Sequence, residues 1–283
     1  MKFSLILATV GRTEEVKRFL ENLDKQTYRD FELIVVDQNS DDSLVPILAQ
    51  YNGHFPILHL HMTTRGASRA RNFGIKYTNG DIIAFPDDDC WYPPDLLYKV
   101  SHVFEKQSEF DGIVVRLLDQ NGAPSTIKGS EKGQSINLIN VQWLAVTQAI
   151  FLRKAVVDKV GLFDETLGVG AGTPWGAGEE TDYLIRALKL GMKLYYIPDN
   201  FVYHPRPANV FDSKYFEKAY NYASGWGRVA RKHYNFKFFI CSGVLRSLGG
   251  IIYALIKGNF VEVHYRMYVL AGKVRGWLSP IKL

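Results

Sequence analysis

The sequence predicts an α/β protein with a mostly parallel sheet, followed by a basic helical extension. Strand and helix patterns alternate over residues 1–120, which is typical of a parallel sheet with helical connections. The first strand patterns are continuous apolar runs, as expected for strands that are buried on both faces. The charge also changes along the chain: residues 1–205 carry 21 Lys and Arg against 26 Asp and Glu, whereas residues 206–283 carry 13 against 3.

The composition excludes two other classes of protein. The chain has 283 residues, of which 47% are hydrophobic and 22% are charged, so it can bury a sizeable core and is too apolar for a disordered chain. It has two cysteines, Cys90 and Cys241. A disulfide-built scaffold and a four-cysteine zinc site are therefore both excluded.

The first elements each have a local reason. Phe3–Thr9 predicts a buried strand rather than a signal peptide, because the apolar run is short and has no small-residue cleavage site. Thr13 offers a helix N-cap, and Glu14 and Glu15 suit the positive end of the helix dipole. The predicted helix places four apolar residues on one face: Val16, Phe19, Leu20 and Leu23.

The remaining elements follow from the same patterns. Strands are predicted at Phe31–Asp37, Ile57–His61, Asp81–Phe85, Gly112–Leu118 and Val146–Leu152, and helices at Ser68–Tyr77, Pro94–Lys106 and Glu180–Leu190. Asp119–Asn140 is rich in turn formers and predicts a loop or hairpin, and Lys193–Ile197 and Asn200–Tyr203 are expected to be extended. In the basic extension, we expect the helices to break at the pairs Gly225/Gly227 and Gly249/Gly250.

Polar side chains follow four of the predicted strands. In an open α/β sheet, ligands bind outside the carboxyl ends of the strands. These ends carry, in chain order, Thr9 and Arg12, then Asp37 and Asn39, then Arg65, then Asp87, Asp88 and Asp89. The sequence therefore predicts one ligand site that these residues share.

The run Asp87–Asp89 is the strongest indication of chemistry. Three adjacent carboxylates raise one another's pKa unless a cation compensates them. A divalent metal that holds a diphosphate is a natural compensator, because hard cations prefer carboxylate and phosphate oxygens. A solvated acidic turn is the alternative.

A basic segment lies upstream of the acidic run. Arg65, Arg69 and Arg71, with Ser68 as a helix N-cap, suit the binding of a phosphate group. The alternative is a basic surface helix that pairs with the acidic run. The chain has no GxxxxGK[ST] loop and no GxGxxG turn after its first strand, which disfavours nucleotide hydrolases and dinucleotide dehydrogenases.

A third group of residues opens the helix predicted at Glu180–Leu190. The carboxylates of Glu179, Glu180 and Asp182 suit the helix dipole, so a structural role is one explanation, and a general base is the other. His204 follows an extended segment and could complete a metal site through a neutral imidazole nitrogen, although a structural histidine is the alternative. The other six histidines show no partner spacing, so we expect them to be ordinary.

Taken in this order, the motifs resemble the family-2 glycosyltransferases of GT-A fold. The resemblance covers about residues 3–205 and rests on Leu5–Arg12, Val35–Ser40, Arg69–Gly74, Asp87–Asp89, Gly161–Glu165 and Gly178–Asp182. It implies a nucleotide-diphospho-sugar donor and an inverting transfer to an acceptor hydroxyl. We therefore expect a GT-A catalytic domain over residues 1–205 and a helical extension over residues 206–283.

The resemblance also implies roles for single residues. Asp37 matches the position that contacts the base or ribose, and Asp87 and Asp89 match the DxD motif, whose last carboxylate holds Mg²⁺ or Mn²⁺. The residues expected to bind the nucleotide sugar are Thr9, Arg12, Asp37, Asn39, Arg65, Arg71, Asp87 and Asp88, and those expected to bind the metal are Asp89, Asp87 and His204.

The base position departs from the family pattern. The family carries a Glu-Asp pair, and this chain has Glu179-Glu180 instead. The alignment of motifs puts Glu180 at the base position, with Asp182 and Glu179 as competitors. Trp175 precedes this motif and could stack on an acceptor sugar, with packing in the core or loop as the alternative.

Two other functions compete with sugar transfer. A sugar nucleotidyltransferase also needs a metal and carboxylates, but Ala8–Arg12 is a poor match to its glycine-rich basic loop. A non-catalytic module that binds nucleotide sugars is the other alternative, and the intact carboxylates of both motifs argue against it.

The extension at residues 206–283 mixes Lys and Arg with aromatic residues, which suits an anionic membrane surface. Because Arg246 interrupts the apolar stretch Phe238–Ile256, an interfacial helix is expected rather than a spanning one. Family-2 glycosyltransferases that build bacterial surface glycans commonly act on lipid-linked acceptors. Together with this surface, the resemblance therefore implies a cytoplasmic protein at the inner face of the membrane, with a saccharide or lipid-linked acceptor in bacterial surface polysaccharide assembly. A helical element for packing or homo-oligomerisation is the alternative. No nucleic-acid partner is expected, because no helix-turn-helix, zinc-finger or RNA-recognition signature is present.

Overall fold

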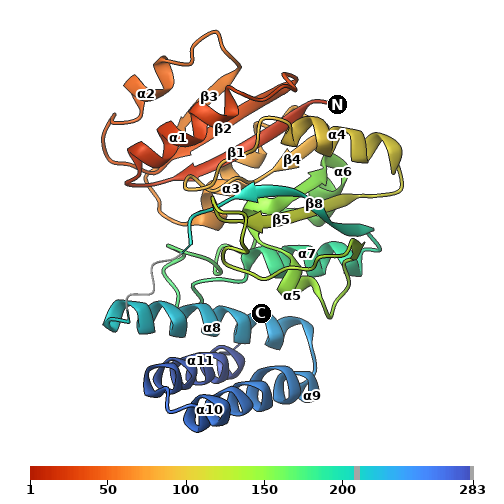
Figure 1. The fold of residues 1–283 in the computed structure, drawn as a ribbon. Coiled ribbons are helices and arrows are strands. Elements are labelled where there is room, and N and C mark those ends of the chain that lie inside the picture. Colours follow the sequence, from red (N-terminus) through yellow and green to blue (C-terminus); the bar gives the residue numbers. More distant parts are fainter. Residues whose placement is uncertain (207–210, 281–283) are drawn as a thin grey trace. The chain divides into compact units, whose positions relative to one another are not determined.

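The computed structural model describes residues 1–206 and 211–280 (Figure 1). The described residues form two compact units, and the chain passes between them more than once. Among the described residues, unit 1 comprises Met1–Arg65, Arg69–Phe163 and residues 183–206, and unit 2 comprises Gly66–Ser68, Asp164–Asp182 and residues 211–280.

Unit 1 contains a mixed sheet whose strand order is β3-β2-β1-β4-β7-β5-β8-β6. The pairs β1–β2, β2–β3, β1–β4 and β5–β8 are parallel, and β6 and β7 pair antiparallel with their neighbours. The strands are β1 (Phe3–Thr9), β2 (Phe31–Asp37), β3 (Ile57–His61), β4 (Ile82–Ala84), β5 (Gly112–Leu118), β6 (Gln134–Ser135), β7 (Ile150–Arg153) and β8 (Leu194–Tyr203). The predicted α/β class with a mostly parallel sheet is confirmed.

Helices connect these strands. They are α1 (Thr13–Leu23), α2 (Val45–Ala49), α3 (Ala67–Ile75), α4 (Leu96–Lys106), α5 (Val141–Leu144), α6 (Lys154–Val160) and α7 (Glu179–Lys189). The chain leaves unit 2 within α7, after Asp182. The four apolar residues predicted to share one face of α1 are all buried.

Two predicted helix caps were wrong. Arg12 occupies the N-cap position of α1, so Thr13 is the first residue of the helix rather than its cap. Ser68 lies inside α3, and its hydroxyl donates a hydrogen bond to the Leu167 carbonyl (2.8 Å). In α1 the residue before Thr13 takes the cap position, and in α3 Ser68 uses its hydroxyl for a contact with a distant residue. Local propensity alone predicts neither outcome.

Three strands also differ in extent from the prediction. Strand β4 covers Ile82–Ala84 instead of Asp81–Phe85. Residues Thr147–Ala149 form a 3₁₀ turn, so β7 begins only at Ile150. The two extended segments predicted after Lys193 form one strand, β8, with a register shift opposite Val115/Arg116 of β5.

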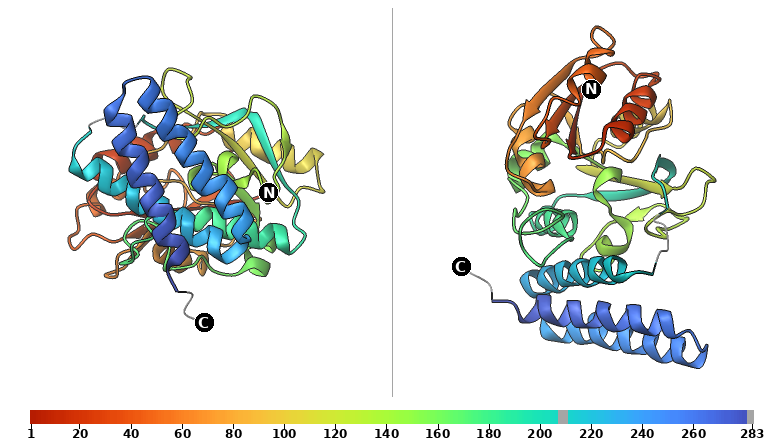
Figure 2. Two further views of the ribbon diagram at one scale, coloured as in Figure 1. Left: turned by 90° about the horizontal axis from the view of Figure 1, so that it is seen from below. Right: turned by 90° about the vertical axis from the view of Figure 1, so that its left-hand side faces the viewer.

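Unit 2 is built around helices α8 (Ser213–His233), α9 (Phe236–Phe238), α10 (Arg246–Ile256) and α11 (Phe260–Leu278), with a π-helical stretch at Phe239–Leu245. Figure 2 shows α8 in one layer, and α10 and α11 side by side in another. The core between them includes Ala230, Phe239 and Trp277.

The predicted helix breaks at the glycine pairs were wrong. Helix α8 runs through Gly225 and Gly227, and α10 runs through Gly249 and Gly250. Three of these glycines are sites of close approach: a Cβ at Gly225 would overlap Ala177, one at Gly227 would overlap Lys273, and one at Gly250 would overlap the Arg266 side chain. The helices end instead at Tyr234 and at Lys257, where Asn235 and Asn259 cap the next helices.

Candidate active site

The carboxyl ends of β1, β2 and β4 lie next to one another in unit 1. Thr9 is the register partner of Asp37, and Ala8 forms an isolated parallel bridge with Asp87 just after β4. These pairings bring together the ends of strands that are far apart in the sequence. They gather most of the polar residues expected there.

The Asp88 side chain is buried at the carboxyl end of β1. Its carboxylate accepts hydrogen bonds from the Thr9 hydroxyl (2.7 Å) and from Arg12 Nη1 (2.7 Å). Burial raises the pKa of Asp88 to about 6, although Thr9 and Arg12 oppose the shift. Asp88 therefore ties β1 to the acidic run.

Asp89 is held between a guanidinium and an imidazole. Arg12 Nη1 lies 2.6 Å from Asp89 Oδ2, and His204 Nε2 lies 3.3 Å from Asp89 Oδ1. Burial on its own raises the pKa of Asp89, but the hydrogen bond and charge of His204, together with Arg12, hold that pKa well below its usual range. For His204, burial lowers the pKa, and the contact with Asp89 more than reverses this, so the pKa of His204 is raised.

The backbone explains why His204 reaches the acidic run. Trp91 and Tyr203 form an antiparallel bridge, which fixes the end of β8 beside the chain that follows Asp89. The His204 backbone N–H donates to the Leu118 carbonyl (2.8 Å). His204 Nδ1 lies 2.6 Å from the Pro205 carbonyl, so Nδ1 carries a proton and Nε2 faces Asp89.

Asp87 pairs with the helix that follows β3. Arg71 Nη2 lies 3.1 Å from Asp87 Oδ1, and the Arg71 side chain is buried. Arg65 is exposed, and its carbonyl accepts a hydrogen bond from Arg69 Nη1 (2.9 Å). Within residues 1–206, the structure thus brings Arg71, but not Arg65, into contact with the acidic run.

Asp37 is fully buried at the end of β2. Its Oδ1 accepts the Asn39 backbone N–H (2.8 Å), and the Asn39 side chain accepts the N–H of Gly11 (2.6 Å). These bonds join the turns after β1 and β2.

Two histidines of β3 also contact Asp37, which the sequence reading missed. His59 Nε2 lies 3.0 Å and His61 Nδ1 4.0 Å from Asp37 Oδ2. Potential ligand atoms of the three residues all lie within 4.8 Å of one another, so this trio is a second place that could hold a metal ion. The expectation that His59 and His61 have no partner was therefore wrong, and their i, i+2 spacing on a strand next to Asp37 was the signal; a metal at this trio stays a hypothesis.

In unit 2, the loop before α7 lies along α8. The Gly176 N–H donates to the Asn221 carbonyl (3.0 Å), and the Arg228 guanidinium lies 4.2 Å from the centre of the Trp175 ring. The close approach of Gly225 to Ala177 belongs to the same contact. Helix α8 therefore supports the segment Trp175–Asp182, which joins this loop to the first turn of α7 and carries the predicted base; we call it the base-carrying loop.

The three predicted base candidates have different surroundings. Asp182 is fully buried and pairs with Lys232 Nζ (2.5 Å) and His233 Nε2 (2.8 Å). Glu179 is also buried, with its carboxylate against Gly168. Glu180 is partly exposed, and the Thr181 hydroxyl lies 3.4 Å from one of its oxygens.

Comparison with known proteins decides the family. The model of "Glycosyl transferase family 2" matches residues 4–157, more than half of the chain. The chain belongs to glycosyl transferase family 2. An uncharacterized glycosyltransferase of Bacillus subtilis, YwdF, is 26% identical over 169 residues, which cover 58% of this chain and 62% of that protein. Glycosyltransferase AglE of Haloferax volcanii is 28% identical over 224 residues, which cover 75% of this chain and 70% of that protein.

The match is partial for some relatives. An uncharacterized glycosyltransferase of Haemophilus influenzae is 33% identical over 111 residues, and these cover 39% of this chain and 37% of that protein. This chain thus spans less than two thirds of the length of YwdF and of the Haemophilus protein.

Solved structures show the same fold. A structure of Staphylococcus aureus TarS 1-349 in complex with UDP-GlcNAc has a TM-score of 0.61 at 16% identity and covers 95% of this chain and 90% of that one. Mannosyltransferase PcManGT from Pyrobaculum calidifontis, in complex with GDP-Man and Mn²⁺, has a TM-score of 0.68 at 15% identity and covers 98% and 87%. The GT-A fold expected for this family 2 member is confirmed.

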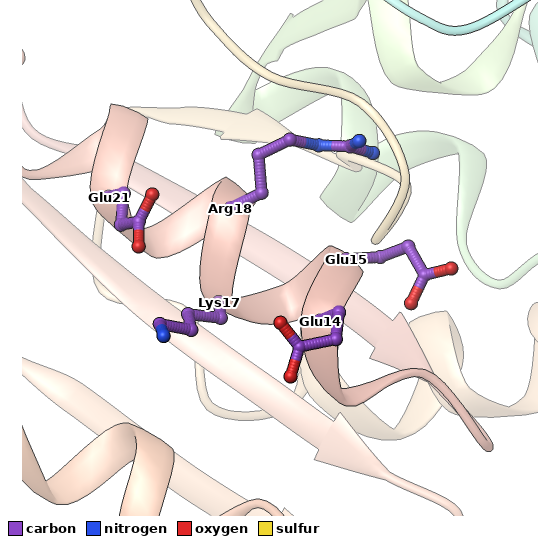
Figure 3. Close-up of a pocket in the computed structure, with 5 residues that line it drawn as sticks. All are labelled: Glu14, Glu15, Lys17, Arg18 and Glu21. Carbon is purple, nitrogen blue, oxygen red and sulfur yellow. The ribbon is translucent and has the colours of Figure 1, made fainter.

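A shallow depression on α1 is not part of this site. Its lining residues all lie on α1, away from the buried face of that helix: Glu14, Glu15, Lys17, Arg18 and Glu21 (Figure 3). Arg18 also donates to the Asp89 carbonyl (3.1 Å) and lies over the Trp91 ring, so it supports the backbone of the acidic run.

Proposed function

We propose that this family 2 member transfers a sugar from a nucleotide-diphospho-sugar to an acceptor hydroxyl. The observation that carries the proposal is the cluster of Asp87, Asp88, Asp89 and His204 at the carboxyl ends of parallel strands, beside buried Asp37. Ligands of open α/β sheets bind at such ends. The structures of TarS with UDP-GlcNAc and of PcManGT with GDP-Man support a nucleotide sugar as the donor.

The residues present fit a divalent metal. Asp89 and His204 offer an oxygen and a nitrogen 3.3 Å apart, and Nδ1 of His204 is held by the Pro205 carbonyl, which leaves Nε2 for a metal. Asp89 and His204, with Asp87, would hold Mn²⁺ or Mg²⁺, and the Mn²⁺ in PcManGT supports this choice. Such an ion, when bound, stabilises the negative charge that gathers on the departing diphosphate.

The residues of the chain account for the other parts of an inverting reaction. Asp37 and Asn39 bind the nucleoside, with Thr9 and Arg12 alongside, and the guanidinium groups of Arg12 and Arg71 add positive charge near the diphosphate. The acceptor oxygen bonds to the anomeric carbon as the bond from that carbon to the diphosphate oxygen breaks.

Glu180 accepts the proton of the acceptor hydroxyl in this proposal. The ion pairs of Asp182 with Lys232 and His233, and the burial of Glu179, favour Glu180 over its two competitors. A sugar that stacks on Trp175 would use the ring face opposite Arg228.

The acceptor and the location of the enzyme follow from the relatives and from the extension. Poly(ribitol-phosphate) beta-N-acetylglucosaminyltransferase TarS is 27% identical over 126 residues, which cover 43% of this chain and 22% of that protein. This supports a saccharide or lipid-linked acceptor in bacterial surface polysaccharide assembly, and a cytoplasmic enzyme at the inner face of the membrane. Membership of family 2 favours this over a nucleotidyltransferase or a non-catalytic binding module.

Thermal stabilisation by a panel of nucleotide sugars with Mn²⁺ tests the donor side, because specific binding raises the melting temperature. We expect one donor to stabilise the protein and Asp89→Ala to abolish that stabilisation. An unchanged affinity of Asp89→Ala for the nucleoside diphosphate and Mn²⁺ would refute the metal assignment.

A further inference from the structure

Helices α10 and α11 expose many large apolar residues, and the most exposed of them flank the turn that joins the two helices. Ile256 is 77% exposed, Phe260 73%, Tyr253 61% and Ile252 58%. We call the whole set the hairpin face: Leu245, Leu248, Ile252, Tyr253, Leu255, Ile256, Phe260, Val261 and Met267. Large exposed apolar patches mark interaction sites in soluble proteins.

The hairpin face is not left over from an incomplete core. Helix α10 buries Ser247 and Ala254, and α11 buries Gly272, Gly276 and Trp277. Leu245 at the N-cap of α10 and Leu248, Ile252 and Ile256 within it recur at helical spacing on the side away from the buried residues of α10. Each helix therefore packs with one face and exposes a second apolar face.

The charges around the hairpin face are almost all positive. Residues 236–280 contain six Lys or Arg and one acidic residue, Glu262. Glu262 pairs with Arg266 (2.8 Å), while Lys257 is exposed in the turn between the two helices and Arg246 is exposed at the start of α10. Apolar and aromatic side chains bordered by cations suit an anionic bilayer surface, where the cations meet lipid phosphates.

The packing of the first part of the hairpin argues for a helix that lies on the bilayer. Residues Phe236–Ile256 form a 21-residue helical run that could cross a membrane by length and composition, which alone is weak evidence. Phe239 of this run packs in a core with Ala230 and Trp277, at 4.3 Å between the Phe239 and Trp277 ring centres. A spanning helix would have to give up this core, whereas an interfacial one keeps it.

Two of the five Lys and Arg residues of α8 contact an earlier segment of unit 2. Arg228 is buried against Trp175, and Lys232 pairs with Asp164 and Asp182. Among the described residues of the extension, these two basic side chains thus hold unit 2 together. Lys214, Lys218 and Arg231 of α8 are exposed, but the hairpin is where exposed cations accompany a large set of exposed apolar side chains, so it is the part best suited to a membrane.

We propose that the hairpin face docks on an anionic lipid bilayer, with Ile252, Ile256 and Phe260 among the upper acyl chains and Lys257 at the phosphates. The inference rests on the membrane location proposed above, and it assigns the surface of the protein that makes the contact. Sugar transfer to a soluble acceptor does not depend on it.

Co-sedimentation of the full chain with phosphatidylcholine–phosphatidylglycerol vesicles tests the proposal. We expect the double variant Ile252→Asp/Ile256→Asp to lower the partition coefficient about 100-fold, since two apolar side chains are lost from the acyl region. Ile139→Asp is the matched control, because Ile139 is 64% exposed in a different part of the chain and should leave binding unchanged. Lys257→Glu should weaken binding about tenfold, and the exposed control Lys25→Glu should not.

Three results would overturn the proposal. Wild-type protein that stays in solution with anionic vesicles would do so, as would a double variant that binds as well as Ile139→Asp. If the double variant instead turns a dimer into a monomer and keeps vesicle binding, the hairpin face is an interface between two copies. Thermal stabilisation of the same variants by the donor tests the proposed function separately. The double variant and Lys257→Glu should still be stabilised by the donor, even where they no longer bind vesicles.

Discussion

Glu180 and Asp182 lie two positions apart at the start of α7, yet their surroundings suit different tasks. Asp182 is fully buried with Lys232 and His233 as partners, an arrangement that holds a carboxylate in place. Glu180 is partly exposed, as a group that must reach an acceptor hydroxyl has to be. At the scale of single residues, this difference in burial and ion pairing supports the proposal that Glu180, rather than Asp182, is the base.

The first prediction concerns this separation. Glu180→Gln keeps the shape of the side chain and removes its ability to take a proton, so kcat should fall by about 10²–10⁴-fold while donor affinity stays unchanged. Steady-state kinetics and calorimetric titration of the donor measure the two quantities. If Glu180→Gln turned over normally and a fully folded Asp182→Asn were inactive, the base would be Asp182.

The second prediction concerns pH. The pKa of His204 is raised by Asp89, so in the metal-free protein their ion pair stabilises the fold at low pH, and this contribution is lost as the pH rises through the His204 pKa. Metal binding needs neutral His204, so a proton must leave the imidazole before Mn²⁺ binds. The Mn²⁺ affinity should therefore increase as the pH rises, whereas the contribution of the ion pair to stability decreases. We expect Mn²⁺ affinity to rise about tenfold per pH unit below that pKa and then level off.

Calorimetric titration with Mn²⁺ across pH 5.5–8.5 measures this dependence. In His204→Gln the Mn²⁺ affinity should be lower, and most of its pH dependence should disappear. A slope that persists unchanged in His204→Gln would assign the proton to another group.

At the scale of elements, the sequence predicts what depends on local patterns. The strands Phe3–Thr9 and Phe31–Asp37 and the buried face of α1 match the structure, because periodicity and apolar runs encode them. The sequence offered His204 as a metal ligand beside the acidic run or as a structural histidine, and the structure places it against Asp89, while its role as a metal ligand stays a prediction. The roles of Gly225 and Lys232 were not foreseen, because each depends on a segment about 50 residues away that local patterns do not reveal.

The third prediction concerns the ion pairs between α7 and α8 in unit 2. Lys232→Met leaves the buried Asp182 with one cation fewer, so the free energy of unfolding should fall by about 3–5 kcal/mol. Lys154→Met is the control, because Lys154 forms an exposed i, i+4 pair with Asp158 (2.7 Å) that should contribute less than about 0.5 kcal/mol. Urea unfolding compares the two variants, and equal effects would contradict the structural role of Lys232.

The fourth prediction concerns the packing of α8 against α11. A Cβ at Gly276 would overlap the Ser224 carbonyl, so Gly276→Ala should destabilise the protein by about 1–3 kcal/mol. A Cβ at Gly249, also within a helix, would meet no atom within 4 Å, so Gly249→Ala should stabilise it by about 0.5–1 kcal/mol. The melting temperature should fall in Gly276→Ala and rise in Gly249→Ala. A higher melting temperature of Gly276→Ala would contradict the close contact of α8 and α11.

At the scale of the whole molecule, the charge changes near residue 205, close to the last boundary between the two units, but unit 2 also includes an earlier segment of the chain. Unit 2 joins Asp164–Asp182, which carries the predicted base, with the helices of the basic extension. The residues predicted to bind donor and metal all lie before residue 205 and belong to unit 1. We therefore propose that the extension has two tasks: α8 supports the base-carrying loop, and the hairpin face meets the membrane.

The fifth prediction concerns a shortened chain that ends at residue 206, in which the donor site can be tested without the extension. This shortened chain keeps Asp37, Asp89 and His204, so Mn²⁺-dependent binding of the nucleoside diphosphate should remain within about tenfold of the full chain. It loses the contacts of α8 with Trp175 and Asp182, so the base is no longer positioned and transfer should fall at least about 100-fold. The full-length variant Ile252→Asp/Ile256→Asp is the matched control, because it retains α8 and should transfer to a soluble acceptor at the full rate. Near-normal transfer by a folded, shortened chain, with circular dichroism as the check on folding, would show that the base-carrying loop holds its position without α8.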